Sequence, residues 1–207
     1  MPASVSDLHM TGKYTVRTLD AFDLARLPFP GTNVEIWKAR AEARLSGAVL
    51  RAVLSESLAV EPAAIKIGTG SHGKPYLRSP CVPIEFNLSH SGECMLLVIS
   101  RSHQVGIDME LERKDFDYAG LSRSFFTEEE RACLQRTSPI ARHGEFLRIW
   151  TRKEALAKAI GAGLSLPFRS VDVLARERSH DGWMLQELDA GTGYLAALAS
   201  RPKQMPR

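Results

Sequence analysis

The chain has 207 residues, 44% of them hydrophobic and 25% charged, which is ordinary usage for a globular protein with one large or two small cores. Its formal net charge of +3 is too small to indicate a nucleic-acid partner, although it permits an anionic substrate or an acidic protein. The sequence has no run of about 20 apolar residues that could span a membrane, and its amino terminus lacks the pattern of a secretory signal. We therefore expect a cytoplasmic protein that binds neither membranes nor nucleic acid.

The cysteine content agrees with that location. Cys81, Cys94 and Cys133 are odd in number, have no Cys-x-x-Cys spacing and lie in apolar surroundings. These features favour buried free thiols over disulfides or zinc ligands, and they suit a reducing compartment.

In the first half of the chain, the apolar pattern predicts a strand near residues 14–19, a helix over 35–58, a strand at 65–68 and a turn at 70–75. The long helix would bury Trp37 and Val53 and carry Arg44 on another face. Three strands follow, joined by short polar turns as an antiparallel meander, at residues 84–89, 94–99 and 104–110.

The second half is predicted to be mainly helical before it returns to strands. A helix opens at Thr127, where Glu130 completes a Thr-x-x-Glu capping box. A second helix over 145–160 ends at Gly161, a C-cap signal that Pro167 reinforces. Strands near 170–174, 183–187 and 194–199 close the chain. Helices alternating with antiparallel strands indicate the α+β class.

Two carboxylates stand out in the strand at 104–110. Side chains of a strand alternate between its faces, so Asp108 and Glu110 share one face with Gly106 while the apolar residues point into a core. Two carboxylates held side by side repel each other unless a cation lies between them. Oxygen ligands of this kind suit Mg²⁺, which takes one or two protein carboxylates and fills its other positions with water and phosphate.

Two further segments place polar groups that could join this pair. In the helix at 145–160, Trp150, Glu154 and Lys158 follow each other every four residues, so a carboxylate and an ammonium stand one turn apart. In residues 86–92, an alternating strand runs into a turn that contains Ser89 and His90. Small donors at the end of a strand make a plausible phosphate cradle.

Taken together, these segments resemble the 4′-phosphopantetheinyl transferase superfamily, specifically its larger type with two similar halves in one chain. The resemblance rests on the turn at 73–75, on residues 86–92 and 106–110, and on residues 150–155 followed by Lys158. The four segments occur in the family's order and at about its spacing, over roughly residues 44–167. The resemblance implies two similar α+β lobes, 1–102 and 103–207, each an antiparallel sheet packed on a long helix, with the active site between them.

The resemblance also implies the activity. Such an enzyme transfers the 4′-phosphopantetheine arm of coenzyme A to a serine of an apo acyl- or peptidyl-carrier protein and releases 3′,5′-ADP. Asp108, Glu110 and Glu154 would bind Mg²⁺, which Mn²⁺ could replace, and Lys158 would contact the diphosphate. Glu154 is also the candidate base for the carrier serine. The sequence leaves open whether it acts as a metal ligand, as the base or as both. We expect a monomer.

Other positions match the family's contacts to coenzyme A. Ser89, His90 and Arg44 would grip its phosphates, with Arg44 at the 3′-phosphate. The family often has further basic residues upstream of Arg44, and Lys38 or Arg40 could substitute for them here. The adenine would lie against Lys74 and Pro75. Lys153 could reach the diphosphate or orient Glu154, and Trp150 is expected to serve packing. The family's contact surface for the carrier corresponds to residues 111–145, where apolar anchors lie beside basic side chains: Phe116, Leu121, Phe125, Phe126, Arg113, Lys114, Arg123, Arg131, Arg136 and Arg142.

Three other readings compete. Residues 68–74 match a nucleotide-binding P-loop up to its last position, where Pro75 replaces the Ser or Thr that would hold Mg²⁺, which argues against an NTPase. A metal-dependent nuclease could use Asp108, Glu110 or Glu112 with Lys114, but it would not explain Ser89 and His90. A carrier-binding scaffold without catalysis would not need intact Asp108, Glu154 and Lys158. The sequence does not show whether a fatty-acid, polyketide or peptide synthase is served.

Overall fold

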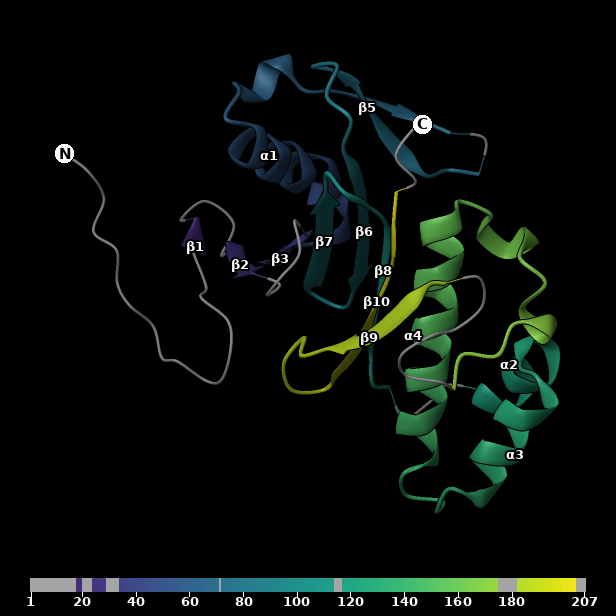
Figure 1. Ribbon diagram of the computed structural model, residues 1–207. Coiled ribbons are helices and arrows are strands. Elements are labelled where there is room, and N and C mark those ends of the chain that lie inside the picture. The colour runs from purple at the N-terminus through teal and green to yellow at the C-terminus, as the bar shows by residue number, and fades with distance from the viewer. Residues whose placement is uncertain are drawn as a thin grey trace.

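The structure, a computed structural model, describes residues 18–19, 24–28, 34–70, 72–113, 117–174 and 182–203. Within these residues the strands form two main antiparallel sheets, and a helix packs on each of them (Figure 1). Mixed helices and antiparallel sheets are what the predicted α+β class requires.

The first sheet contains five strands, in the order β1 (Thr18–Leu19), β2 (Leu24–Pro28), β3 (Val34–Arg40), β7 (Cys94–Ser100) and β6 (Glu85–Ser91). Helix α1 (Ser46–Leu58) packs Val49 and Val53 into one core with Trp37 and Met95 of the sheet. All seven residues of β7 are buried, because the opposite face of the sheet is covered as well. A strand covered on both faces reads as a continuous apolar run.

The second sheet contains three strands, in the order β8 (His103–Leu111), β10 (Tyr194–Pro202) and β9 (Met184–Leu188). Helix α4 (Arg142–Ile160) packs on it, and α2 (Tyr118–Phe125) and α3 (Glu128–Arg136) lie on the far side of α4 (Figure 1). The capping box is confirmed, since Thr127 Oγ1 accepts from the Glu130 amide and the Glu130 carboxylate accepts from the Thr127 amide. Helix α4 ends, as predicted, at Gly161 in the left-handed conformation.

Helix α4 approaches β8 most closely at Gly106. A Cβ at this position would lie 2.2 Å from the backbone oxygen of Ala155 and 2.2 Å from the backbone nitrogen of Ala159, far inside van der Waals contact. Only glycine fits there. This close approach brings Glu154 and Lys158, the residues just before Ala155 and Ala159, next to the carboxylates of β8.

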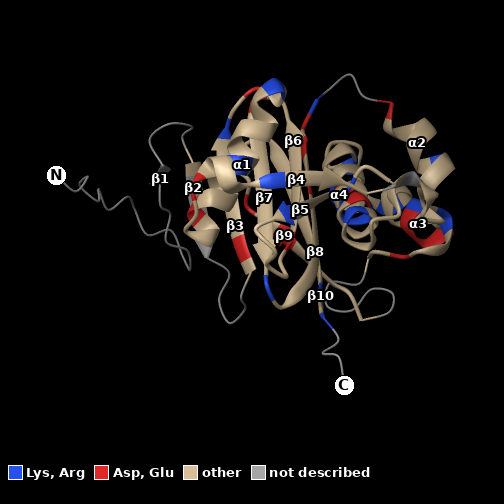
Figure 2. Ribbon diagram, turned by 90° about the horizontal axis from the view of Figure 1, so that it is seen from above, with Lys and Arg blue, Asp and Glu red and all other residues tan. Residues whose placement is uncertain are grey.

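The two sheets are joined by a shared apolar core. Val34 and Ile36 of β3 and Leu96 and Val98 of β7 pack in one cluster with side chains of the second sheet: Val105, Ile107, Met109, Ala196 and Leu198. Figure 2 shows the result from above, with α1 and α4 on opposite sides of the strands.

Strands β6 and β8 meet at this junction through side chains rather than through a backbone ladder. Asn87 Oδ1 accepts from the Ile107 amide at 3.1 Å, Ser89 Oγ from the Met109 amide at 3.3 Å, and Ser91 Oγ from the Leu111 amide at 3.0 Å. The two residues of each bond are 20 positions apart in the sequence in all three cases, so the strands run parallel. We call Asn87, Ser89 and Ser91 the side-chain ladder.

Smaller elements complete the described part of the chain. Strands β4 (Lys66–Thr69) and β5 (Pro75–Ser79) form a two-stranded sheet. Four short 3₁₀ helices lie at Ala43–Leu45, Pro62–Ala64, Gly163–Ser165 and Phe168–Ser170. None of the helices described is both long and apolar enough to cross a membrane.

The long helix predicted over 35–58 is wrong in its first part. Residues 34–40 form β3, and the helix begins at Ser46. Ile36 faces the core shared by the two sheets and Trp37 faces the core under α1, so apolar residues are required on both faces of this strand. The resulting run has no strict alternation, so its local pattern does not distinguish it from the start of the helix.

Other predictions also need correction. The meander stops at β7, because β8 pairs with β10 in the other sheet. Residues 170–174 are not a strand, and β5 and α2 were not foreseen. The predicted strand at 14–19 lies mostly outside the described residues. All three cysteines are free, as expected, but only Cys94 is buried, since Cys133 is half-buried and Cys81 is exposed.

Candidate active site

Three carboxylates and one ammonium gather in a pocket of about 360 Å³ between β6, β8 and α4. We call it the carboxylate pocket, and its lining residues are Leu88, Ser89, His90, Asp108, Glu110, Trp150, Glu154 and Lys158. Asp108 and Glu110 share a face of β8, as the strand pattern predicts. Glu154 and Lys158 come from the α4 face that Gly106 lets approach.

Asp108 is the most buried member, only 3% exposed. Its Oδ1 accepts from Lys158 Nζ at 2.7 Å and from Ser89 Oγ at 2.9 Å. Its Oδ2 is buried and has no hydrogen-bond partner. A buried carboxylate oxygen without a partner is costly, because it has lost water and gained nothing in exchange. A cation bound at this oxygen would remove that cost.

The other two carboxylates have raised pKa values. Burial, and next the negative charge of Asp108, raise the pKa of Glu110, although the hydrogen bond from Ser91 at 3.0 Å partly opposes this. Burial and then Asp108 also raise the pKa of Glu154, against the opposing effect of Lys158. The negative charge of Asp108 therefore disfavours the ionisation of both glutamates, which is the condition that a bound divalent cation relieves.

The donor set fits Mg²⁺ or Mn²⁺ in its chemistry, because every candidate ligand is an oxygen. As the side chains lie, however, no three His, Cys, Asp or Glu groups among the described residues converge closely enough to hold an ion. The ammonium of Lys158 occupies the position beside Asp108 Oδ1 that a cation would use. The partnerless Oδ2 of Asp108 still favours a cation at this place, because rotation about their side-chain bonds can turn the carboxylates of Glu110 and Glu154 toward it.

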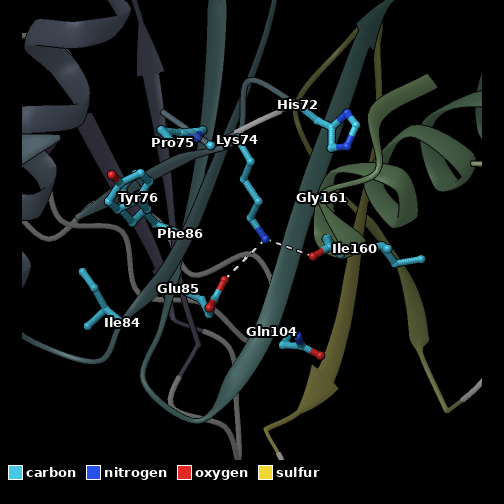
Figure 3. Close-up of a pocket in the computed structure, with 12 residues that line it drawn as sticks. His72, Lys74, Pro75, Tyr76, Ile84, Glu85, Phe86, Gln104, Ile160 and Gly161 are labelled. Carbon is cyan, nitrogen blue, oxygen red and sulfur yellow. Dashed lines mark hydrogen bonds and ion pairs between the residues drawn. The ribbon is translucent and has the colours of Figure 1, made fainter. Parts of the chain in front are cut away.

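A second pocket, also of about 360 Å³, lies where the turn before β5 meets the end of α4 (Figure 3). We call it the turn pocket. Lys74 crosses its floor and donates to the Ala159 carbonyl at 2.9 Å, and its ammonium pairs with Glu85 at 3.3 Å. Apolar and aromatic surface comes from Pro75, Tyr76, Ile84 and Phe86. Both pockets are built on β6 and α4, so an extended ligand could occupy the two together.

The structure does not support a contact between Lys153 and a phosphate. This side chain is fully buried on the opposite side of α4, where its ammonium pairs with Glu130 at 2.8 Å and donates to the carbonyls of Phe168 and Val171 at 2.7 and 2.6 Å. The sequence prediction is corrected here: a lysine next to Glu154 in the chain points away from it, because neighbours on a helix diverge by about 100°. Lys153 anchors α4 to α3 and to residues 168–171.

Arg44 lies outside both pockets. It is in the 3₁₀ turn before α1, exposed, and its Nε pairs with Glu42 at 2.7 Å. Of the two residues suggested for the family's missing upstream basic groups, Arg40 pairs with Glu93 at 2.8 Å and Lys38 donates to the Ala190 carbonyl at 2.6 Å. The structure thus does not bring Arg44 together with the other predicted residues.

Trp150 packs as predicted. Its ring makes an edge contact with Phe125 and stacks on Phe146, and it also lines the carboxylate pocket. The P-loop reading fails, because the residue after Lys74 begins a strand and not a helix. Sequence reasoning missed Glu85 and Ser91. The alternation of Asn87, Ser89 and Ser91 on one face of a strand was the available signal for the latter.

The comparisons with known proteins all point to one family. The model of the 4′-phosphopantetheinyl transferase superfamily matches residues 104–191, which include β8 and α4. The 4′-phosphopantetheinyl transferase HetI of Nostoc sp. is 33% identical over 159 residues, which cover 73% of this chain and 67% of the relative. A 4′-phosphopantetheinyl transferase of Bacillus subtilis is 32% identical over 165 residues, 74% of this chain and 71% of the relative.

A third relative, from Escherichia coli, matches over a shorter length. The 4′-phosphopantetheinyl transferase AcpT of that organism is 38% identical over 122 residues, 59% of this chain and 60% of the relative. The identity and coverage of the two longer matches decide the assignment. The chain belongs to the 4′-phosphopantetheinyl transferase superfamily and is an enzyme of that class.

Proposed function

We propose that this enzyme transfers the 4′-phosphopantetheine arm of coenzyme A to a serine of an apo acyl- or peptidyl-carrier protein and releases 3′,5′-ADP. One observation carries the proposal: Asp108, Glu110, Glu154 and Lys158 share one pocket with Ser89 and His90. The serine oxygen of the carrier attacks the phosphorus next to the pantetheine arm. The bond from that phosphorus to the bridging diphosphate oxygen breaks, and the ADP portion leaves with the bond electrons.

Each group of the pocket has a role in this reaction. Asp108, Glu110 and Glu154 would hold Mg²⁺ or Mn²⁺, which supplies neutralisation of the diphosphate charge. Lys158, already held by Asp108, reaches the same oxygens with a second positive charge. Glu154 takes the proton of the carrier hydroxyl as the general base, because it is an ionisable carboxylate in the same pocket as Lys158 and the proposed diphosphate contacts.

The contacts proposed for the diphosphate and the adenine of coenzyme A lie in the two pockets. Ser89 and His90 lie beside the carboxylates, where they would grip the diphosphate. Lys74 and Pro75 line the turn pocket, whose apolar walls suit the adenine ring. The 3′-phosphate is assigned to Arg44, whose exposed guanidinium would exchange Glu42 for the phosphate. Binding across both pockets would hold the substrate in a fixed orientation for in-line attack.

The proposed enzyme acts as a monomer with two lobes, residues 1–102 and 103–207, and the reaction takes place between the lobes.

The proposed contact surface for the carrier lies on α2 and α3. A pocket of about 260 Å³ between these helices is lined by Arg123, Arg131 and Arg142 beside Tyr118 and Leu134. Guanidinium groups around apolar side chains suit the acidic surface of a carrier. Lys114 and Phe116, also predicted in this surface, lie outside the described residues.

The test is to incubate the protein with coenzyme A, Mg²⁺ and a panel of apo-carriers and to weigh the carriers by mass spectrometry. We expect one carrier to gain a single phosphopantetheine. Glu154→Gln is the matched control, because it keeps the shape of the side chain while removing the charge, and it should slow the step by about 10²–10⁴. If a carrier binds but is never modified, the protein would be a carrier-binding scaffold without catalysis. Cleavage of DNA with Mg²⁺ instead would indicate the nuclease.

A further inference from the structure

Ser91, at the end of β6, touches two groups of the opposite sheet with one oxygen. Its Oγ accepts a hydrogen bond from the Leu111 amide at 3.0 Å and donates one to Glu110 Oε2 at 3.0 Å. A serine hydroxyl has a single proton. Because the amide can only donate, the geometry commits that proton to the carboxylate of Glu110.

We propose that Ser91 is a positioning residue, which holds Glu110 beside Asp108 and so raises the cation affinity of the carboxylate pocket. The proposal rests on the assignment of these carboxylates as metal ligands under the proposed function. It adds a group from the first sheet to a site whose β8 carboxylates and α4 side chains come from the other half of the chain.

The physical reason is repulsion between like charges. Asp108 and Glu110 lie on one face of β8 and line the same pocket, so the ionised Glu110 is pushed away from the position where both acids could share a cation. A glutamate side chain has three rotatable bonds and would turn toward water to escape. The bond from Ser91, itself 7% exposed and fixed by a backbone amide, opposes this movement. Groups that orient a metal ligand commonly change affinity by about 10- to 100-fold.

The side-chain ladder contains its own control. Asn87, at the other end, accepts from the Ile107 amide at 3.1 Å just as Ser91 accepts from Leu111, and no bond from it to a carboxylate is present among the described residues. Asn87→Ala therefore breaks the junction between β6 and β8 without releasing Glu110. Ser89 is unsuitable for this purpose, because its hydroxyl also contacts Asp108 and Lys158.

The experiment is a titration of the full chain with Mn²⁺, followed by electron paramagnetic resonance of the free ion, without coenzyme A or carrier. We expect Ser91→Ala to weaken Mn²⁺ binding about 10-fold, at the low end of the range for a ligand-orienting group. Asn87→Ala should bind Mn²⁺ as the wild type does, although both variants should melt at lower temperature. If Ser91→Ala does not fold, Ser91→Cys, a weaker donor of similar size, provides the same test.

A double-mutant cycle identifies the mechanism. In a Glu110→Gln background, Ser91→Ala should cause no further loss of Mn²⁺ affinity, since the charge it positions is gone. Equal losses from Ser91→Ala and Asn87→Ala would overturn the proposal in favour of a loosened junction, and unchanged affinity in Ser91→Ala would overturn it directly. Failure of the wild type to bind Mn²⁺ would remove the metal assignment as well. Transfer to a carrier is measured separately, so the proposed function stands or fails on its own assay.

Discussion

Glu110 and Glu154 carry raised pKa values, and this makes the stability of the metal-free protein depend on pH. A carboxyl whose pKa is higher in the folded than in the unfolded state binds its proton more tightly when folded. The folded state therefore loses stability as pH rises from the ordinary value of 4.5 through the raised values. A bound cation should cancel this loss by neutralising the ionised acids.

We predict that the rise in melting temperature caused by Mg²⁺ is small near pH 4.5 and grows as pH increases through the raised pKa values. The measurement is thermal unfolding across pH with and without Mg²⁺. The control is the variant Glu110→Gln/Glu154→Gln, which keeps every other titrating group, including Glu130. Its response to Mg²⁺ should be weaker at every pH. A wild-type response independent of pH would show that these two carboxylates do not bind the ion.

The buried pair of Lys153 and Glu130 determines a second prediction. Neither side chain is exposed, and burial lowers the pKa of Lys153 and raises that of Glu130 despite their attraction. Removing one partner leaves an uncompensated charge in the core, so Lys153→Met or Glu130→Gln should each destabilise the protein by about 3–5 kcal/mol in urea unfolding. The double replacement should cost less than the sum of the two.

The same variants test the corrected role of Lys153. If it only anchors α4, the Lys153→Met protein that remains folded should bind coenzyme A with nearly wild-type affinity in calorimetry. A large loss of affinity in fully folded protein would restore the contact with the diphosphate. Arg152, its neighbour on α4, is no suitable control, because it is buried and bonded to Glu187.

At the level of elements, the contact between α4 and β8 depends on Gly106. Gly106→Ala would place a methyl group 2.2 Å from the backbone of α4, which no rotamer can relieve. We predict that the helix is displaced, with a loss of stability beyond the usual 0.5–3 kcal/mol of a point mutation, here about 3 kcal/mol or more. Cation affinity should fall with it, because Glu154 and Lys158 move away from Asp108.

Gly144→Ala, in helix α4 itself, provides the control for a glycine whose replacement meets no neighbour. A Cβ there meets nothing within 4 Å, and replacing a helical glycine by alanine should stabilise the protein by about 0.5–1 kcal/mol. Chemical denaturation of both variants gives the comparison. If Gly106→Ala were as stable as the wild type, the close approach would not position the site.

These elements also show what could be predicted from the sequence. Alternation placed Asp108 and Glu110 on one face, and helical spacing placed Glu154 and Lys158 one turn apart, because both patterns are local. The partner strand of β8 and the contact of Ser91 with Glu110 are decided by tertiary packing, which a local pattern does not contain. Lys153 was misassigned for the same reason, since its partner Glu130 is distant in sequence.

On the scale of the whole molecule, the two sheets share one core and should unfold together. Leu198 of β10 is fully buried in that shared core, in one cluster with side chains of β7 and β8. The three tryptophans allow each half to be followed, because Trp37 lies in the core under α1 while Trp150 and Trp183 lie in the core around α4. Fluorescence of a Trp37→Phe protein reports the second half, and that of a Trp150→Phe/Trp183→Phe protein reports the first.

We predict that Leu198→Ala lowers the free energy of unfolding by about 2–5 kcal/mol, the cost of a large-to-small change in a core, and that it does so equally in both tryptophan backgrounds. The reason is that Leu198 belongs to the second sheet but lies in the core cluster that includes side chains of β3 and β7 of the first, so its loss should weaken both halves. Ile140→Ala, at a side chain that is 97% exposed, should change neither transition and serves as the control. Two separate transitions, with only the second half destabilised by Leu198→Ala, would mean that the halves fold independently and that the carboxylate pocket between β6 and β8 forms only when they dock.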